Sequence, residues 1–427
     1  MTTFTKSGSE FRIDSPGHGV SSCPAIAALT SGGFVVSWTD NAYPMNEISG
    51  PDIKARLYSS TGNPVGREFF VNRETIDYQQ SSKIAGLLDG GFVAVWQDFS
   101  GRGGDACGSG IKARVFGENG EIVRNEFLVN QETKDNQISP TVAALPHGGF
   151  LVAWQDFSRT RGDDSLGSIK ARLFGTDGAP HSEEFLVNTY TNDQQGHPAA
   201  TGLVGGGFVV VWHDFSGTLG DFSSGSIKLK VYGPACDVIR EELLVNTSKW
   251  NNQNLPVIAG LEHGGFVVSW TDGSGTLGDN SGTSIKARLF DELGIAASDE
   301  FLVNTETLNC QIRPCVSSLT DGGFVIAWAD YSGRGEDASS SGIKARLYGY
   351  NGRPLQSELL VNSETEGEQK LTAVAGLVDG GFVVCWQDSG SPARGSKMSV
   401  VKAQQFCRRS AKHTIETDLG VSAILGE

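Results

Sequence analysis

The sequence predicts an all-β fold, a seven-bladed β-propeller of four-stranded antiparallel blades. Three observations lead there: a 58-residue repeat, a strand in each repeat that lacks a polar face, and incomplete repeats at both ends. Gly-Gly-Phe followed by a mostly apolar triplet and Trp recurs every 58 residues, starting at Gly32, Gly90, Gly148, Gly206, Gly264, Gly322 and Gly380. Seven matches in one frame, without an insertion, are typical of a repeat architecture.

Each repeat contains four predicted strands, which we call a, b, c and d in chain order. Examples are 140–145 for a, 207–212 for b, 169–174 for c and 126–130 for d. An Asp-Gly pair between a and b, as at 89–90, predicts a two-residue hairpin. Strand b is apolar on both faces, so its sheet must be covered on both sides. Blades stacked face to face around an axis meet that requirement.

The two ends of the repeat region predict a closed ring. Residues 10–14 form a lone strand d, and residues 401–406 form a strand c whose own strand d is missing. The first segment can therefore complete the last blade, whereas a linear solenoid would need caps. We expect an extension at 1–9, one propeller at 10–406 and a tail at 407–427. Separate β-sandwiches are the rival interpretation, which the uninterrupted period disfavours.

Composition excludes several classes of protein. The formal net charge is −15 and no basic stripe is present, so nucleic acid is not an expected partner. No apolar run reaches the roughly 18 residues of a spanning helix, so membrane insertion is not expected. The first residues lack the pattern of a cleaved export signal. The seven Cys are odd in number and out of register with the repeat, which favours free thiols over a disulfide framework, although Cys310 and Cys315 could pair.

The repeat resembles the Gly-Gly-Phe-Val-Val-x-Trp repeats of large secreted bacterial adhesins and RTX-type, calcium-associated proteins. The resemblance covers residues 10–406 and implies export through an uncleaved C-terminal signal, for which 408–427 could serve; a cytoplasmic location is the alternative. The chain lacks the calcium-binding Gly-Gly-x-Gly-x-Asp nonapeptides of RTX proteins.

Four residue types recur in every repeat and predict structural rings. The strand-b Trp should pack in the core, because large aromatics supply buried area; they are Trp38, Trp96, Trp154, Trp212, Trp270, Trp328 and Trp386. An Asp ends strand b, a Lys stands in strand c and a Glu begins strand d. Since strand c lies between b and d, we expect each Lys to pair with both carboxylates.

Ligand-binding residues are expected on the face that carries the long b–c loops and the d–a connections, since long loops are usually functional. Six Gln precede strand a and should rim the channel mouth, unless their amides satisfy loop backbone groups: Gln79, Gln137, Gln195, Gln253, Gln311 and Gln369. Five Asp recur in the b–c loops and could help to hold Ca²⁺, or could simply form turns: Asp105, Asp163, Asp221, Asp279 and Asp337.

The fourth repeat departs from the others near the predicted mouth. It carries His197 at the start of strand a, with His213 and Asp214 at the end of strand b. Counted from the turn, His197 falls opposite His213 or Asp214. Two His and a carboxylate could ligate Zn²⁺ with an open position, or supply an acid–base pair. Drift at a variable rim position is the plainer interpretation.

These features favour a non-enzymatic, monomeric adhesion propeller that presents repeated, weak sites to glycans or to a protein partner. No cofactor is required, and no nucleotide loop, His-Glu-x-x-His, Gly-x-Ser-x-Gly or Cys-x-x-Cys motif occurs. A structural scaffold is the first alternative. A metal-dependent hydrolase or lyase with its site near His197 and His213 is the second.

Overall fold

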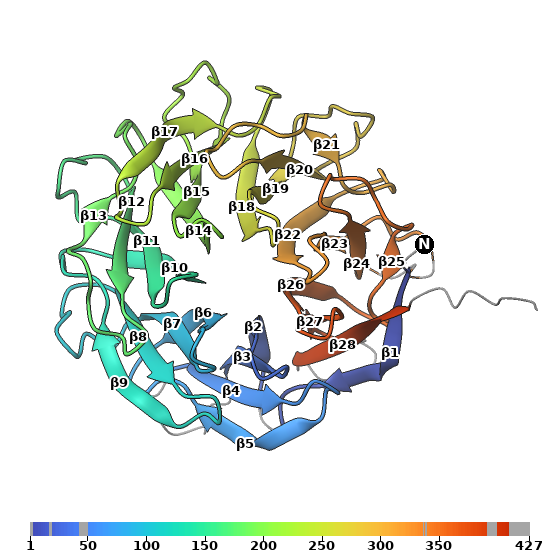
Figure 1. Cartoon of the computed structure of the whole chain (residues 1–427), viewed down its shortest axis with the longest axis horizontal. Helices are drawn as coiled ribbons and strands as arrows, with labels where there is room; N and C mark the ends of the chain where they lie inside the picture. Colours follow the sequence, from blue (N-terminus) through green and yellow to red (C-terminus); the bar gives the residue numbers. More distant parts are fainter. Residues whose placement is uncertain are drawn as a thin grey trace, which may run out of the picture.

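The computed structural model describes residues 3–16, 19–41, 50–335, 337, 340–390 and 399–409. These residues form seven four-stranded antiparallel sheets arranged in a ring, which confirms the seven-bladed propeller (Figure 1). No helix among them is long and apolar enough to span a bilayer. The expected C-terminal export signal falls mostly on 410–427, outside the described residues.

The strands occupy the predicted order in every blade. The innermost strands, type a, are β2 (Ser21–Ala28), β6 (Gln79–Gly86), β10 (Gln137–Ala144), β14 (Gln195–Gly202), β18 (Gln253–Gly260), β22 (Gln311–Ser318) and β26 (Gln369–Gly376). The b strands are β3 (Phe34–Asp40), β7 (Phe92–Asp98), β11 (Phe150–Asp156), β15 (Phe208–Asp214), β19 (Phe266–Asp272), β23 (Phe324–Asp330) and β27 (Phe382–Asp388). The c strands are β4 (Asp52–Tyr58), β8 (Gly110–Phe116), β12 (Ser168–Phe174), β16 (Ser226–Tyr232), β20 (Ser284–Phe290), β24 (Gly342–Tyr348) and β28 (Val400–Arg409).

The outer strands, type d, differ in length. They are β5 (Pro64–Phe70), β9 (Ile122–Leu128), β13 (Phe185–Leu186), β17 (Val238–Leu244), β21 (Phe301–Leu302), β25 (Leu359–Leu360) and β1 (Thr3–Arg12). β13, β21 and β25 are only two residues long, and the first two share a local contact. Ser182 and Ser298 accept hydrogen bonds from the backbone of strand c through their hydroxyls, in place of a strand carbonyl.

The core lies between blades, where the apolar strands b stack. Every strand b is buried along its whole length, and all seven ring Trp are 0–1% exposed. Each strand-b Phe also stacks on the aromatic that ends strand c, as Phe92 does on Phe116 at 4.8 Å between ring centroids. The prediction that the Trp ring is core packing is therefore confirmed.

The two Gly residues of each repeat are required in the a–b hairpin for different steric reasons. Gly90 accepts the left-handed backbone with φ of 95°, whereas a Cβ on Gly91 would lie 2.3 Å from the carbonyl oxygen of Phe116. Asp89 is not left-handed, and Gly90 N donates to Leu87 O. The hairpin is a type I turn followed by a left-handed Gly, so the predicted two-residue turn was wrong.

The N-terminal strand closes the ring, as predicted. β1 pairs with β28 in the last blade, from Thr3 opposite Arg409 to Arg12 opposite Lys402. The strand thus begins at Thr3, so most of the expected extension at 1–9 belongs to the propeller. All seven Cys lie in the described part of the chain, and none of them forms a disulfide.

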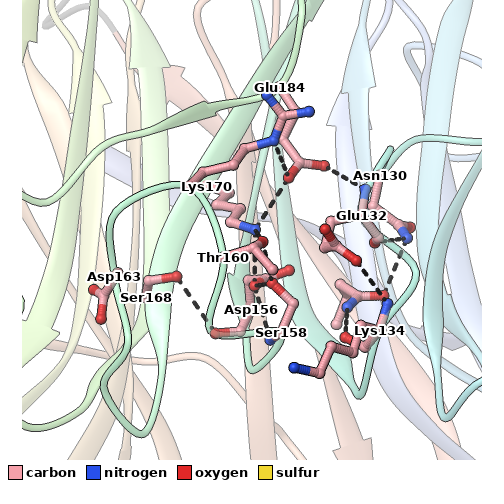
Figure 2. Close-up of polar contacts among 12 residues, drawn as sticks. Asn130, Glu132, Lys134, Asp156, Ser158, Thr160, Asp163, Ser168, Lys170 and Glu184 are labelled. Atoms are coloured by element: carbon pink, nitrogen blue, oxygen red, sulfur yellow. Dashed lines mark hydrogen bonds and ion pairs between the residues drawn. The ribbon is translucent and has the colours of Figure 1, made fainter.

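Each blade contains an Asp–Lys–Glu triad, as the charged rings predicted, and the triads range from fully buried to partly exposed. In the third blade Lys170 Nζ lies 3.0 Å from Asp156 and 3.1 Å from Glu184, and the three side chains are fully buried (Figure 2). Corresponding pairs form in the other six blades, and the last one uses Glu10 from β1. Glu184 also accepts a 2.7 Å hydrogen bond from Gln131 N, so the triad joins neighbouring blades.

Candidate functional site

The six predicted Gln belong to a set of buried polar side chains that support the loops of the long-loop face, and we call this set the frame. All six are fully buried, and each donates from Nε2 to the carbonyl oxygen three residues earlier. Gln137 also accepts a 3.0 Å hydrogen bond from Asn130 Nδ2. The expectation that these Gln rim the channel mouth is thus corrected: their amides satisfy the loops, because a buried amide needs partners.

The five loop Asp belong to the same frame. Each is buried and accepts a hydrogen bond from the Asn two residues after strand d, as Asp221 does from Asn246 at 2.8 Å. The other oxygen of Asp105 accepts from Cys107 N, and burial raises the pKa of this carboxyl. These residues shape the loops instead of lining their surface, which corrects their assignment as ligand contacts. Calcium binding stays a prediction.

The Asn that follows strand d is the hub of this frame, and it was not among the predicted site residues. Asn130 accepts from Ile111 N at 2.8 Å and donates to Asp105, Glu132 O and Gln137 (Figure 2 shows Asn130 beside Glu132). An Asn stands two residues after strand d in six repeats, at 72, 130, 188, 246, 304 and 362, and Asp14 takes this place in the last blade. Its recurrence was the signal that could have found it.

The channel mouth is formed by a β-bulge in every innermost strand. Each a–b pairing shifts register at the same two residues, such as Ser81 and Ser82 in β6. The first bulge residue has a positive φ of 50–58° in all seven blades, although none is Gly: Cys23, Ser81, Ser139, His197, Leu255, Arg313 and Leu371. Bulges re-aim side chains, and left-handed non-Gly residues gather at functional sites.

These seven residues and the residue after each line a cavity of about 440 Å³ at the mouth, together with Lys83 and Val257. No Asp or Glu is among the lining residues, in a protein of net charge −15. Lys83 and Arg313 supply the charged groups of this lining, and His197 and Cys23 supply an imidazole and a thiol. Groups of these kinds can bind an anion or take part in general acid–base chemistry.

His197 and His213 lie side by side at this mouth, but Asp214 lies apart from them. The two imidazole centroids are 6.5 Å apart. Gly196 is paired with His213 and Gln195 with Asp214, so His197 sits in the bulge and is opposite neither. Asp214 is engaged by Lys228 at 2.8 Å. The donors of the three residues do not converge, which corrects the predicted metal set.

Among the described residues, the three acidic groups whose oxygens do converge are Glu10, Glu364 and Asp388. The Lys402 ammonium lies within 3.0 Å of an oxygen of each. That cluster already has its cation.

The two imidazoles have different environments. His213 is buried, bonded through Nε2 to Asn252 Oδ1 at 3.1 Å and packed on Phe215, and burial lowers its pKa to about 4. A Cβ on Gly225 would lie 2.2 Å from that Nε2, so Gly225 makes room for the ring. His197 is exposed at the cavity, and its pKa is lowered by partial burial and by the Arg313 charge. Both imidazoles are neutral at neutral pH.

Two exposed aromatic side chains lie on connections beside the fourth blade, the blade that carries His197 and His213. Trp250 is 74% exposed and Phe222 is 84% exposed, on two connections that lie side by side through the Gly225–Asn252 bridge. Buried frame residues hold both connections: Gln253 donates to Trp250 O, and Asn246 bonds Asp221, the residue before Phe222. The sequence analysis missed Trp250, although it is the one Trp outside the 58-residue ring.

A second hollow, of about 810 Å³, lies on the opposite, short-turn face. Its lining includes Glu262, His263, Asp291 and Glu292, and Glu292 reaches over to accept from Gly205 N at 3.0 Å. This hollow is built from the ordinary a–b and c–d turns of neighbouring blades.

Comparison with known proteins extends the fold assignment. No family model matches the chain, and no curated protein matches it. A protein of unknown function from Dyadobacter fermentans shares 9% identity over 95% of this chain and 99% of its own, with a TM-score of 0.54. An α-L-arabinanase from Penicillium chrysogenum complexed with arabinobiose shares 11% identity over 94% and 98%, with a TM-score of 0.51. At such identities the likeness shows the fold alone.

These comparisons correct the expectation of a non-enzymatic adhesion propeller. An α-L-arabinofuranosidase from Fusarium graminearum, in complex with an iminosugar inhibitor, shares 10% identity over 94% of this chain and 98% of its own, with a TM-score of 0.50. Chains that match nearly end to end thus include glycosidases. The prediction of a non-enzymatic adhesion propeller is therefore wrong.

Proposed function

We propose that this protein is a glycan-processing enzyme whose active site lies at the long-loop mouth of the axial channel, on the side of the fourth blade. The observation that carries the proposal is the concentration of departures from the repeat in that one sector. His197, His213, Phe222 and Trp250 lie there on a frame that the other blades share. A repeated fold needs such a departure to make one site.

The groups present suit acid–base work on a sugar. His197 reaches the cavity and is neutral at neutral pH, so it can accept a proton as a general base. His213 lies behind it, anchored by Asn252, and is placed to position the first ring. Trp250 and Phe222 offer exposed aromatic faces on which sugar rings can stack. The arabinanase and arabinofuranosidase named above support the proposal, because they process glycans on this fold.

The first prediction tests the site with a change drawn from the chain itself. His197→Ser introduces the residue that Ser81 and Ser139 supply at the same place in two other blades, so the fold should be kept. We expect the purified protein to release new chain ends from at least one member of a panel of neutral and acidic polysaccharides. His197→Ser should lower that rate by about 10²- to 10⁴-fold.

The matched control is His263→Ser, which removes an imidazole from the opposite face. Its activity should equal that of the unmodified protein. Loss of activity in His263→Ser with full activity in His197→Ser would move the site to the short-turn hollow. Failure of the folded protein to process any polysaccharide would contradict the proposal altogether.

A further inference from the structure

The axial mouth carries a cationic pair that the repeat does not require. Arg313 occupies the bulge position that Leu255 and Leu371 fill in other blades. Lys83 occupies a place on strand a held elsewhere by Ala25, Thr141, Ala199, Val257, Cys315 and Ala373. Two cations therefore replace small or apolar side chains on a frame that folds without them.

In the part of the chain that the structure describes, these cations have no protein counter-charge. Within the described part of the chain, no side chain forms an ion pair or hydrogen bond with the Lys83 ammonium or the Arg313 guanidinium. The cavity lining contains no carboxylate. Solvent reaches Lys83 through the channel, yet protein surrounds it, and this desolvation, with a contribution from the Arg313 charge, lowers its pKa. Unpaired cations in a concave site focus a positive potential that draws in an anion.

The lining also argues against hydrolysis by paired carboxylates at this place. Most glycosidases use two Asp or Glu residues that flank the scissile bond. Here the groups are an imidazole, an ammonium and a guanidinium, which suit removal of a proton beside a carboxylate whose charge is neutralised.

This inference rests on the proposed function. We propose that the substrate is a uronate, a glycan with a carboxylate on its sugar ring, and that the enzyme cleaves it by β-elimination. Arg313 binds and neutralises the ring carboxylate. His197 takes the proton from C5, the carbon that bears the carboxylate.

The step balances without an added reactant. The C5–H electron pair forms the C4–C5 double bond, and the bond from C4 to the glycosidic oxygen breaks. The Lys83 ammonium donates a proton to that leaving oxygen. One new non-reducing end carries the double bond, and no water is consumed. Proton exchange with solvent then restores His197 and Lys83.

The second prediction uses two readouts on the same reaction, with polygalacturonate, alginate and hyaluronan as acidic substrates and arabinan as a neutral one. New reducing ends report any cleavage, and ultraviolet absorbance of the conjugated double bond reports elimination. We expect both signals to rise together on at least one uronate polymer and neither to rise on arabinan. Arg313→Leu and Lys83→Ala, which copy other blades, should each lower the rate about a hundred-fold or more.

Arg67→Leu, on the outer strand β5, removes an exposed guanidinium far from the axis and should leave the rate unchanged. Reducing ends without the double bond would overturn elimination while keeping a glycan-processing enzyme. Cleavage of arabinan that is indifferent to Arg313→Leu would overturn recognition of a carboxylate. Cleavage of none of the polymers would overturn the proposed function itself.

Discussion

At the residue scale, the channel mouth combines a backbone conformation that is the same in all seven blades with side chains that differ between blades. All seven bulge residues share a φ near 50–58°, yet they include Cys, Ser, His, Leu and Arg. A left-handed non-Gly residue costs about 1 kcal/mol or more, so the geometry persists because the surrounding hairpin imposes it. Function can therefore vary at these positions without disturbing the fold.

The third prediction concerns the buried imidazole. The pKa of His213 is lowered from 6.5 to about 4, chiefly by burial. The unfolded chain binds this proton between those values and the folded chain does not. The free energy of unfolding should thus be fully retained above pH 6.5 and fall as the pH drops toward 4, by about 3 kcal/mol at most.

His213→Gln copies Gln97, Gln155 and Gln387, and should remove most of that dependence. Urea unfolding of both proteins at several pH values across this window measures the effect. In this variant His197 still makes the free energy of unfolding fall as the pH drops, but by less, because its pKa is also lowered. An identical pH profile in the variant would show that His213 is protonated without cost in the fold.

Much of the site could be predicted from residues that break the repeat, and less from residues that keep it. The His197–His213 neighbourhood followed from such a break. The Gln and Asp rings were misplaced because their amides and carboxylates turn inward to bond loop groups, as Gln137 and Asp105 do, and the sequence does not show which way these side chains point. Trp250 was missed because it lies in a connection between strands, outside the residues that recur in every repeat.

At the element scale, the strands were predictable because the 58-residue period and the apolar strand b leave few alternatives. What the pattern could not predict is the state of strand d, which is seven residues long in β5 and two in β13. In β13 and β21 a Ser hydroxyl replaces the strand carbonyl, but β25 is equally short and has Gln356 at that position. The triads were predictable, because strand c carries a Lys and lies between an Asp on strand b and a Glu at strand d.

The fourth prediction compares two triads that differ in burial. Lys170 is fully buried between Asp156 and Glu184, so Lys170→Met leaves two carboxylates without their cation. This variant should lose about 3–5 kcal/mol of unfolding free energy. Lys54→Met, in a triad whose Lys is 14% exposed, should lose clearly less, because solvent can replace part of the lost interaction.

Chemical denaturation of the two variants beside the unmodified protein gives the comparison. Equal losses would mean that burial does not set the strength of these triads. No loss in either would mean that their role is confined to alignment of the blades.

At the scale of the whole molecule, ring closure decides whether the blades act as one unit. β1 supplies Phe4 to the core between the last two blades, Glu10 to the seventh triad and Asp14 as the hub that accepts from Val401 N. One short segment therefore completes each structural layer of the last blade. The axial cavity depends on this closure, because it takes lining residues from all seven blades.

The fifth prediction separates loss of the strand from loss of chain order. Deletion of residues 1–14 should lower the melting temperature and promote aggregation, because β28 becomes an unpaired edge. Thr3 lies opposite Arg409, so a short turn can join them as strands c and d are joined in other blades. A permuted chain that opens at residues 17–18, places 3–16 after 409 and omits the tail should melt close to a tail-less chain of natural order. Scanning calorimetry and size-exclusion chromatography on the three chains report both properties.

If the deleted chain melts like the natural one and stays monomeric, β1 does not hold the ring together. If the permuted chain is as unstable as the deleted one, its stability depends on where the chain begins, and pairing of β1 with β28 is not sufficient for closure.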